Sequence, residues 1–391
     1  MELNDKKNGS ITCMNCVTGK LEKITFHEDR IMEIIETKSN ENNIPFVGPG
    51  LIDLQINGIN GIDFNIPSLR QEDIQNATHY LLSKGITTFL PTVITNSDEN
   101  ILTILRSINQ ACAFDQLVNE CVWGIHLEGP FISPKNGAKG AHDEKYIKAP
   151  DWDLFSRFQK AAGGKIKLIT IAPEWEESPS FIEKCRAHGV LVSIGHSLAN
   201  TEQISMAVKA GATLSTHLGN GVPLLLPRHP NLLWDQLAEE NLYSCIITDG
   251  LHIPDSFIKV VMQIKGRNTL VISDATCFAG MPPGEYQSHI GGTVILDHEK
   301  RVSLKDSPGL LAGAGKSLLE NVETLIDHKL STLSEAWQMA SLNVADMLAK
   351  SDGSFKEKKD DFVVFQLKDK EIKIGKVIKN GRIVFEKSLF D

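Results

Sequence analysis

Short apolar runs alternate with amphipathic stretches through the middle of the chain. Each run is short enough for a strand, and the stretches between them repeat their apolar residues at helical spacing. The apolar runs lie at residues 51–56, 87–93, 122–127, 167–172, 191–195, 212–216, 244–248 and 269–273. The helical pattern is clearest over residues 73–84, 178–188, 201–210 and 255–265. Strand and helix units repeated in this way predict an α/β fold, a TIM-like (β/α)₈ barrel.

Both ends of the chain have the composition of short β-strands. Strand patterns occupy residues 10–35 and 362–385, and Asn380-Gly381 is a typical hairpin turn. We therefore predict a small β-sandwich domain formed by both termini, residues 1–47 and 355–391. The barrel domain would then cover residues 48–354.

Composition narrows the classes of function. The net charge of −9 and the lack of a Lys/Arg cluster argue against a nucleic-acid partner. No run of ~18 apolar residues is present, so we expect no membrane span. Seven cysteines, an odd number without a disulfide framework, indicate a reducing compartment, and the polar first twenty residues do not resemble a signal peptide. We expect a cytoplasmic protein.

Polar residues follow several of the predicted inner strands. Glu128 ends one strand just before Gly129-Pro130, and histidines follow four strands: His126, His196, His217 and His252. Catalytic groups of parallel α/β folds lie at these carboxyl ends. A Glu with two His is an ordinary ligand set for Zn²⁺ or a related divalent ion. The alternative for Glu128 alone is a helix cap or a salt bridge.

Other polar residues lie on the same predicted face. Asp274 follows the last strand, where a carboxylate beside a metal ion could take a proton from water and pass it to a departing nitrogen. A helix cap is its alternative role. Asn220 and Gly221 form a turn able to bind an anion through backbone N–H groups. Arg228 offers a guanidinium suited to phosphate, or else a surface salt bridge. His142 returns towards Glu128 and could hold a substrate carbonyl.

The order of motifs resembles the N-acetylglucosamine-6-phosphate deacetylase family of the amidohydrolase superfamily. The motifs that carry this resemblance are PGLIDLQING at 49–58, GITTFLPT at 85–92, HLEGPF at 126–131, KGAH at 139–142, APE at 172–174, GHS at 195–197, THL at 216–218, DGLH at 249–252 and SDA at 273–275. They cover nearly the whole chain. Relatives that act on other N-acetylated amino sugars have the same order of motifs.

The resemblance implies a role for each candidate residue. Glu128, His196 and His217 correspond to metal ligands, Asp274 to the general acid/base, and His142 to a residue that contacts the acetamide or the sugar. The phosphorylated sugar would be held partly across a homodimer interface by residues at four positions, Asn220, Gly221, Arg228 and His252.

The metal content also follows from the resemblance. Many amidohydrolases have His-x-His after the first strand and bind two metals, whereas this chain has Gln55-Ile-Asn57. Because an amide is a poor ligand for a transition metal, we expect one tight site. Zinc is the expected ion, and iron or another divalent ion is the alternative.

Several departures from the family pattern border the expected sugar pocket. Residues 218–222 read LGNGV, residues 224–230 are unusually apolar for a segment beside phosphate, and residues 315–318 read GKSL. The expected reaction converts N-acetylglucosamine 6-phosphate to glucosamine 6-phosphate and acetate. The alternatives are N-acetylgalactosamine 6-phosphate, an unphosphorylated N-acyl compound, or a non-catalytic sugar-phosphate sensor.

Overall fold

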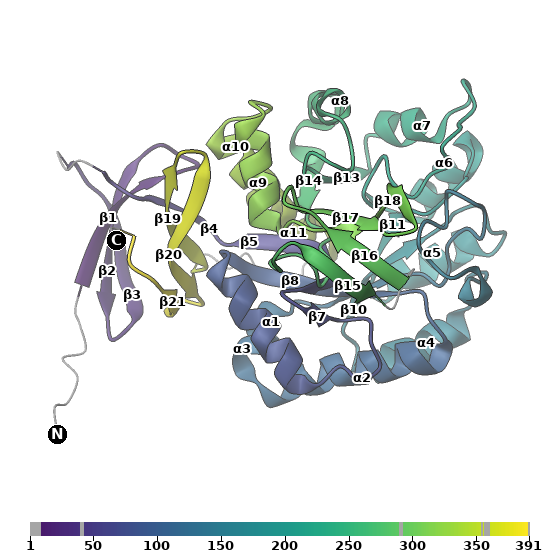
Figure 1. The fold of residues 1–391 in the computed structure, drawn as a ribbon, viewed down its shortest axis with the longest axis horizontal. Helices are drawn as coiled ribbons and strands as arrows, with labels where there is room; N and C mark the ends of the chain where they lie inside the picture. The colour runs from purple at the N-terminus through teal and green to yellow at the C-terminus, as the bar shows by residue number, and fades with distance from the viewer. Residues whose placement is uncertain (1–8, 40–42, 289–291, 353–354, 356–359, 390–391) are drawn as a thin grey trace.

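The computed structural model describes residues 9–39, 43–288, 292–352, 355 and 360–389. Two β-structures lie side by side in it (Figure 1). A small one, at the left of the figure, contains the first and last strands of the chain. A larger one, surrounded by helices, contains the middle of the chain.

The small β-structure is built from both ends of the chain, as predicted. Its strands are β1 (Gly9–Asn15), β2 (Leu21–His27), β3 (Arg30–Glu36), β4 (Phe46–Pro49), β19 (Phe362–Lys368), β20 (Glu371–Lys379) and β21 (Arg382–Glu386). Strand β4 pairs in parallel with β1 and antiparallel with β19, so the sheet of the expected sandwich closes on itself. The exact boundary between two domains stays a prediction, since β4 crosses residue 47.

The large β-structure is the predicted (β/α)₈ barrel. Its parallel strands are, in order, β5 (Leu51–Ile56), β8 (Ile86–Ile94), β9 (Ile125–Glu128), β10 (Ile166–Ile171), β11 (Leu191–Ile194), β12 (Leu214–Ser215), β13 (Tyr243–Ile247) and β14 (Thr269–Ile272). Every apolar run that predicted an inner strand overlaps one of these. A bridge between Ile56 and Ala275 brings the last strand back to the first.

The helices cover the outside of this barrel (Figure 1). They are α1 (Gln71–Ser83), α2 (Asp98–Phe114), α3 (Gln116–Cys121), α4 (Trp152–Ala161), α5 (Ser178–Ala187), α6 (Thr201–Ala210), α7 (Leu232–Ala238), α8 (Asp255–Lys265), α9 (Leu318–Asp327), α10 (Leu333–Met339) and α11 (Leu342–Asp352). The short 3₁₀ helices are η1 (Glu144–Tyr146) and η2 (Gly266–Asn268). The buried faces of α1 to α10 pack with the strands in one large apolar cluster, and α11 packs with other strand residues in a second.

An antiparallel sheet between β14 and α9 was not predicted. Its strands are β15 (Gly284–Ser288), β16 (Gly292–Leu296), β17 (Arg301–Leu304) and β18 (Ser307–Ala314). A small hairpin of β6 (Gly58–Ile59) and β7 (Ile62–Asp63) follows β5. Both insertions come directly after a strand end, where they can cover the carboxyl end of the barrel.

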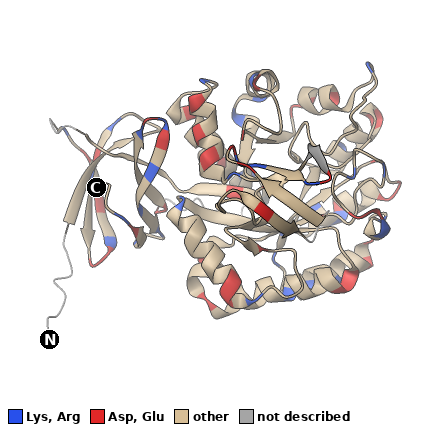
Figure 2. Ribbon diagram, viewed as in Figure 1, with Lys and Arg blue, Asp and Glu red and all other residues tan. Residues whose placement is uncertain are grey.

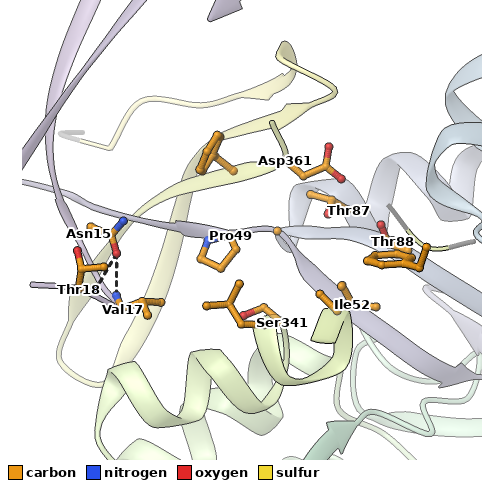
Figure 3. Close-up of a pocket in the computed structure, with 14 residues that line it drawn as sticks. Asn15, Val17, Thr18, Pro49, Ile52, Thr87, Thr88, Ser341 and Asp361 are labelled. Atoms are coloured by element: carbon orange, nitrogen blue, oxygen red, sulfur yellow. Dashed lines mark hydrogen bonds between the residues drawn. The ribbon is translucent and has the colours of Figure 1, made fainter. Parts of the chain in front are cut away.

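A buried lysine joins the two β-structures. Lys379 of β20 lies 2.8 Å from Asp361 and donates a hydrogen bond of 2.5 Å to the carbonyl of Thr87 on β8. Trp337 stacks on Phe365 with ring centroids 4.3 Å apart. A hollow of about 360 Å³ lies beside these contacts, and Figure 3 shows the residues that line it, among them Asp361, Thr87 and Ser341.

Charged residues of both signs are interspersed over the ribbon in Figure 2. None of the helices in the described residues has the length and apolarity needed to span a bilayer.

Candidate active site

A pocket of about 120 Å³ lies at the carboxyl ends of the barrel strands. Five of the residues singled out from the sequence line it together, namely Glu128, His142, His196, His217 and Asp274. Both insertions contribute to the wall, through Asp63 of β7 and through Ala312 and Gly313 of β18. The unpredicted sheet therefore forms part of the site.

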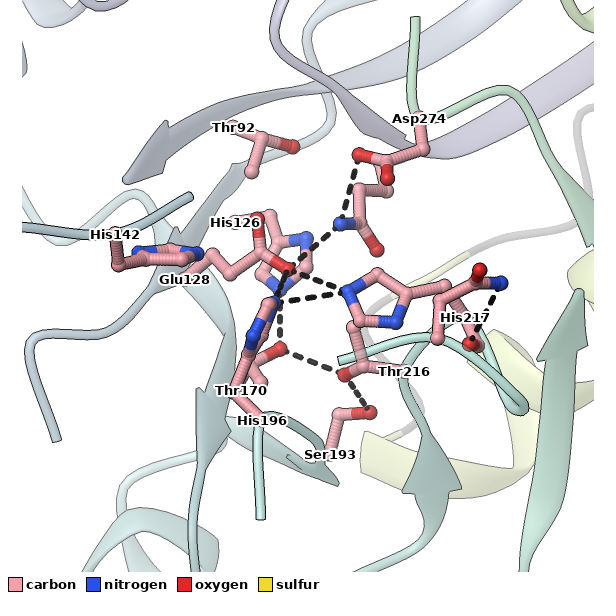
Figure 4. Close-up of polar contacts among 12 residues, drawn as sticks. Thr92, His126, Glu128, His142, Thr170, Ser193, His196, Thr216, His217 and Asp274 are labelled. Atoms are coloured by element: carbon pink, nitrogen blue, oxygen red, sulfur yellow. Dashed lines mark hydrogen bonds and ion pairs between the residues drawn. The ribbon is translucent and has the colours of Figure 1, made fainter. Parts of the chain in front are cut away.

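Glu128, His196 and His217 converge on one point. Oε1 of Glu128 lies 3.3 Å from Nε2 of His196 and 3.1 Å from Nε2 of His217, and the two nitrogens are 3.0 Å apart. Figure 4 shows the three side chains reaching this point from different strand ends. Among the described residues they are the group of three that could hold a metal ion.

This trio fits a divalent cation. Ligand atoms at about 2.0–2.1 Å from a tetrahedral ion are about 3.3 Å from one another, close to the spacing seen here. Nδ1 of His196 lies 2.8 Å from the carbonyl of Ala138, which accepts its hydrogen and leaves the Nε2 lone pair for the ion. The two buried cysteines with metal-like spacing, Cys13 and Cys16, do not belong to such a group in the described part of the chain.

The trio also attracts positive charge. Burial alone would raise the pKa of Glu128, but hydrogen bonds and charge from the two histidines hold that pKa well below its ordinary value. For His217, burial lowers the pKa, and the hydrogen bond and charge of Glu128 outweigh it and raise the pKa. The site is therefore complementary to a cation.

A sharp change of backbone direction presents three of these residues to the pocket. His196, His217 and Asp274 have φ values of 50°, 27° and 49°, each two residues beyond the end of β11, β12 or β14. Non-glycine residues in the left-handed region cost of order 1–3 kcal/mol each and concentrate at functional sites.

Asp274 is held by two amides from β5 and its extension. Its Oδ1 accepts hydrogen bonds of 3.0 Å from Gln55 and 2.8 Å from Asn57. Gln55 also donates to Oε1 of Glu128 at 2.8 Å. Burial and the charge of Glu128 raise the pKa of Asp274 to about 6, a value suited to proton transfer near neutral pH. The helix-cap alternative does not apply, since a loop follows Asp274.

His142 closes one side of the pocket. Its Nδ1 lies 2.8 Å from Oγ1 of Thr95, and its ring packs edge-on to His196 with centroids 4.5 Å apart. Burial lowers the pKa of His142 to about 3, so the imidazole is neutral near pH 7. Thr95 was missed in the sequence analysis, although it follows β8 immediately and so meets the strand-end criterion.

His126 does not join the trio. It lies two residues before Glu128 on the same strand, so its side chain has the same direction one layer deeper in the barrel. There its Nε2 is 2.7 Å from Oγ1 of Thr170, which in turn contacts Thr216. Burial lowers the pKa of His126 to about 4. This histidine belongs to the polar interior of the barrel.

The four residues expected to hold a phosphorylated sugar lie outside the lining of this pocket. Gly221 is adjacent to it, since a Cβ there would lie 2.9 Å from Nδ1 of His196. Asn220 donates to the carbonyl of His217 at 3.4 Å. His252 is oriented by Asp249, which the DGLH motif includes but to which the sequence analysis gave no role; Oδ2 of Asp249 lies 2.7 Å from Nδ1 of His252. Arg228 is exposed on the surface.

The hollow of Figure 3 lies elsewhere and offers different chemistry. It adjoins β5 and β8 near their amino ends, at Ile52 and Thr87. Its carboxylate, Asp361, is already paired with Lys379. The carboxyl end of the barrel therefore holds the candidate active site.

Comparisons with known proteins agree with this geometry. The sequence profile of the amidohydrolase family matches residues 46–384. N-acetylglucosamine-6-phosphate deacetylase from Bacillus subtilis is 32% identical over 86% of this chain and 84% of its own length. N-acetylgalactosamine-6-phosphate deacetylase from Shewanella sp. is 31% identical over 77% of this chain and 74% of its own length.

Solved structures share the whole architecture. N-acetyl-D-glucosamine-6-phosphate deacetylase from Mycobacterium smegmatis superposes with a TM-score of 0.81 at 23% identity, over 96% of this chain and all of that chain (100%). N-acetylglucosamine-6-phosphate deacetylase from Thermotoga maritima superposes with a TM-score of 0.80 at 25% identity, over 96% of this chain and 99% of that chain.

Proposed function

The chain belongs to the amidohydrolase family, and on this premise we propose that it hydrolyses the acetamide of an N-acetylated amino sugar phosphate. The substrate favoured by its relatives is N-acetylglucosamine 6-phosphate, which would give glucosamine 6-phosphate and acetate. One observation carries the proposal: Glu128, His196 and His217 converge within hydrogen-bonding distance in a pocket that Asp274 also lines.

The chemistry follows from the positions of these groups. A divalent cation held by Glu128, His196 and His217 would polarise the amide carbonyl and acidify water beside it. Asp274 takes a proton from the attacking water and passes it to the departing nitrogen. Neutral His142, with Thr95 hydrogen-bonded to its Nδ1, donates from Nε2 to the carbonyl oxygen.

The preferred ion in this proposal is Zn²⁺, present once per chain. Two imidazoles and one carboxylate form a common catalytic zinc set with an open position. The places where a second ion would need ligands hold the amides of Gln55 and Asn57, whose nitrogens donate hydrogen bonds and cannot bind a cation.

The phosphate end of the substrate would meet Asn220, Gly221, Arg228 and His252. We infer a homodimer, because the segment that includes Arg228 is unusually apolar and exposed: Leu224 and Leu225 are 93% and 90% exposed, and Trp234 is 54% exposed. A second copy of the chain would cover these side chains and bring its loop towards the sugar. The free thiol state of all seven cysteines supports a cytoplasmic location.

Acetate release tests the proposal. Protein purified without added ions would be analysed for bound metal and assayed with N-acetylglucosamine 6-phosphate, N-acetylgalactosamine 6-phosphate and N-acetylglucosamine. We expect about one zinc per chain and at least tenfold higher kcat/KM for N-acetylglucosamine 6-phosphate than for the other two compounds. A higher kcat/KM for N-acetylgalactosamine 6-phosphate would favour the substrate in the name of the Shewanella relative instead. No acetate from any compound would contradict the proposal and favour a sensor.

The role of Arg228 has a matched control. Arg228→Ala should lower kcat/KM only for phosphorylated substrates. Arg157→Ala, which removes an exposed arginine on α4, should leave kcat/KM unchanged for both phosphorylated and unphosphorylated substrates. Equal losses on phosphorylated and unphosphorylated compounds would rule out a phosphate contact.

A further inference from the structure

Gln55 connects the two carboxylates of the active site. It is 2% exposed, and its Nε2 donates to Oε1 of Glu128 at 2.8 Å and to Oδ1 of Asp274 at 3.0 Å. Both hydrogens of the amide nitrogen are thereby used. One side chain thus contacts a metal-ligand candidate and the acid/base candidate at once.

Two buried carboxylates in one pocket repel each other unless something positive lies between them. A second cation could do this, and so could donated N–H groups, whose dipoles point their positive ends at both oxygens. The amide carries no net charge and neither gains nor loses charge in the working pH range. It therefore links the carboxylates without competing for the proton that Asp274 transfers.

The same contacts make the two oxygens of Asp274 unequal. Oδ1 accepts from both Gln55 and Asn57, at 3.0 and 2.8 Å. No donor to Oδ2 is found among the described residues. An oxygen with two N–H donors is the weaker base, so Oδ2 is the atom left to receive a proton.

We propose that Gln55 is a positioning residue that bridges Glu128 to Asp274, offsets the repulsion between them through its two N–H donors and leaves Oδ2 of Asp274 as the reacting oxygen. This inference rests on the proposed function for its kinetic consequence. Its consequence for metal binding does not depend on the substrate.

The kinetic test uses Gln55→Met, which keeps the length of the side chain and removes both donors. We expect kcat to fall at least tenfold, KM to change less than threefold, and one metal per chain to remain. Gln159→Met on α4 is the matched control, since it also removes a hydrogen-bonded glutamine amide, in this case one paired with the backbone of Ile166, and should leave kcat unchanged. Asn57→Leu, which removes only the donor to Asp274, should lower kcat without metal loss.

The metal test uses Gln55→Glu. A third carboxylate between Glu128 and Asp274 replaces the N–H donors with negative charge, so the variant should bind two divalent ions per chain when titrated with Zn²⁺, while the parent binds one. Calorimetry or mass spectrometry of the native protein measures this without substrate. Thermal melting would establish that each variant is folded.

Three results would overturn the inference: a Gln55→Met kcat within threefold of the parent, loss of the first metal from that variant, or a single ion bound by Gln55→Glu. If the parent cleaves no N-acetylated sugar, the proposed function fails, yet the count of ions in Gln55→Glu still decides whether the bridge exists.

Discussion

Oε1 of Glu128 lies 3.1 Å from Nε2 of His217, although the two residues are 89 positions apart in the chain. Strands β9 and β12 bring them together from different parts of the barrel, and the turn after β12 directs the imidazole inward. A contact of this kind depends on the whole fold, so it is a sensitive point for substitution.

Glu128→Gln should abolish tight metal binding. The amide removes the negative charge that the cation needs, so activity should fall by more than the roughly 10- to 100-fold typical of residues behind the ligands. Metal content by mass spectrometry and the rate of acetate release measure the two effects. His188→Asn, which changes an exposed histidine after α5, should keep the parent's metal content and its rate of acetate release. A Glu128→Gln protein with full metal content would contradict the ligand assignment.

Asp274→Asn should separate proton transfer from metal binding. Loss of a general acid/base lowers kcat by roughly 10²–10⁴-fold, while the trio of ligands stays intact. Steady-state rates and metal analysis of the same sample give both quantities. Turnover within a few-fold of the parent would show that another group moves the proton.

The acid limb of the pH profile should reflect Asp274. Burial and the charge of Glu128 raise its pKa to about 6, and the residue must be ionised to accept a proton. The rate should therefore fall as the pH drops through that value. A bound cation favours the ionised carboxylate, so half-maximal kcat/KM should lie at or below about pH 6. A half-maximal kcat/KM above pH 7 would contradict the assignment of this limb to Asp274. The Asp274→Asn variant should show no such fall in rate at low pH.

Lys379→Met should destabilise the fold without affecting the pocket. The Lys379 and Asp361 side chains are 0% and 6% exposed, so the substitution leaves an unpaired buried carboxylate. The free energy of unfolding should drop by about 3–5 kcal/mol in urea titrations. Replacing both residues, with Lys379→Met and Asp361→Leu, should restore most of the lost free energy of unfolding. Lys20→Met, at the exposed pair with Glu36, should change the free energy of unfolding far less.

The barrel was predictable because its strands are buried on both faces. Residues of β5, β8 and β14 are all buried, so each appears in the sequence as a short, predominantly apolar run. Strand β15 shows the opposite case: Gly284–Ser288 is largely exposed and has no such run. Turn signals after Leu296 and at Asp306 could have indicated the antiparallel sheet, but no periodicity pointed to its position over the site.

The candidate site was predictable only for residues that stand at the end of a predicted strand. Glu128, His196, His217 and Asp274 each stand at such an end, so the sequence places them on one face. The bridge through Gln55 could not be foreseen, because pairing of an amide with two carboxylates depends on distances across the barrel. Likewise, residues two positions apart on a strand point to the same face, so the sequence puts His126 and Glu128 of β9 on one face. Their roles differ because His126 lies one layer deeper in the barrel than Glu128.

Strand β4 pairs with β1 from the start of the chain and with β19 from its end. During synthesis, the roughly 300 residues between β4 and β19 take on the order of 15–60 seconds to emerge at 5–20 residues per second. Throughout that interval the amino-terminal strands have open edges, which are prone to pair with other chains. A ribosome that stops before β19 would therefore release a product inclined to aggregate, even with every candidate metal ligand already made.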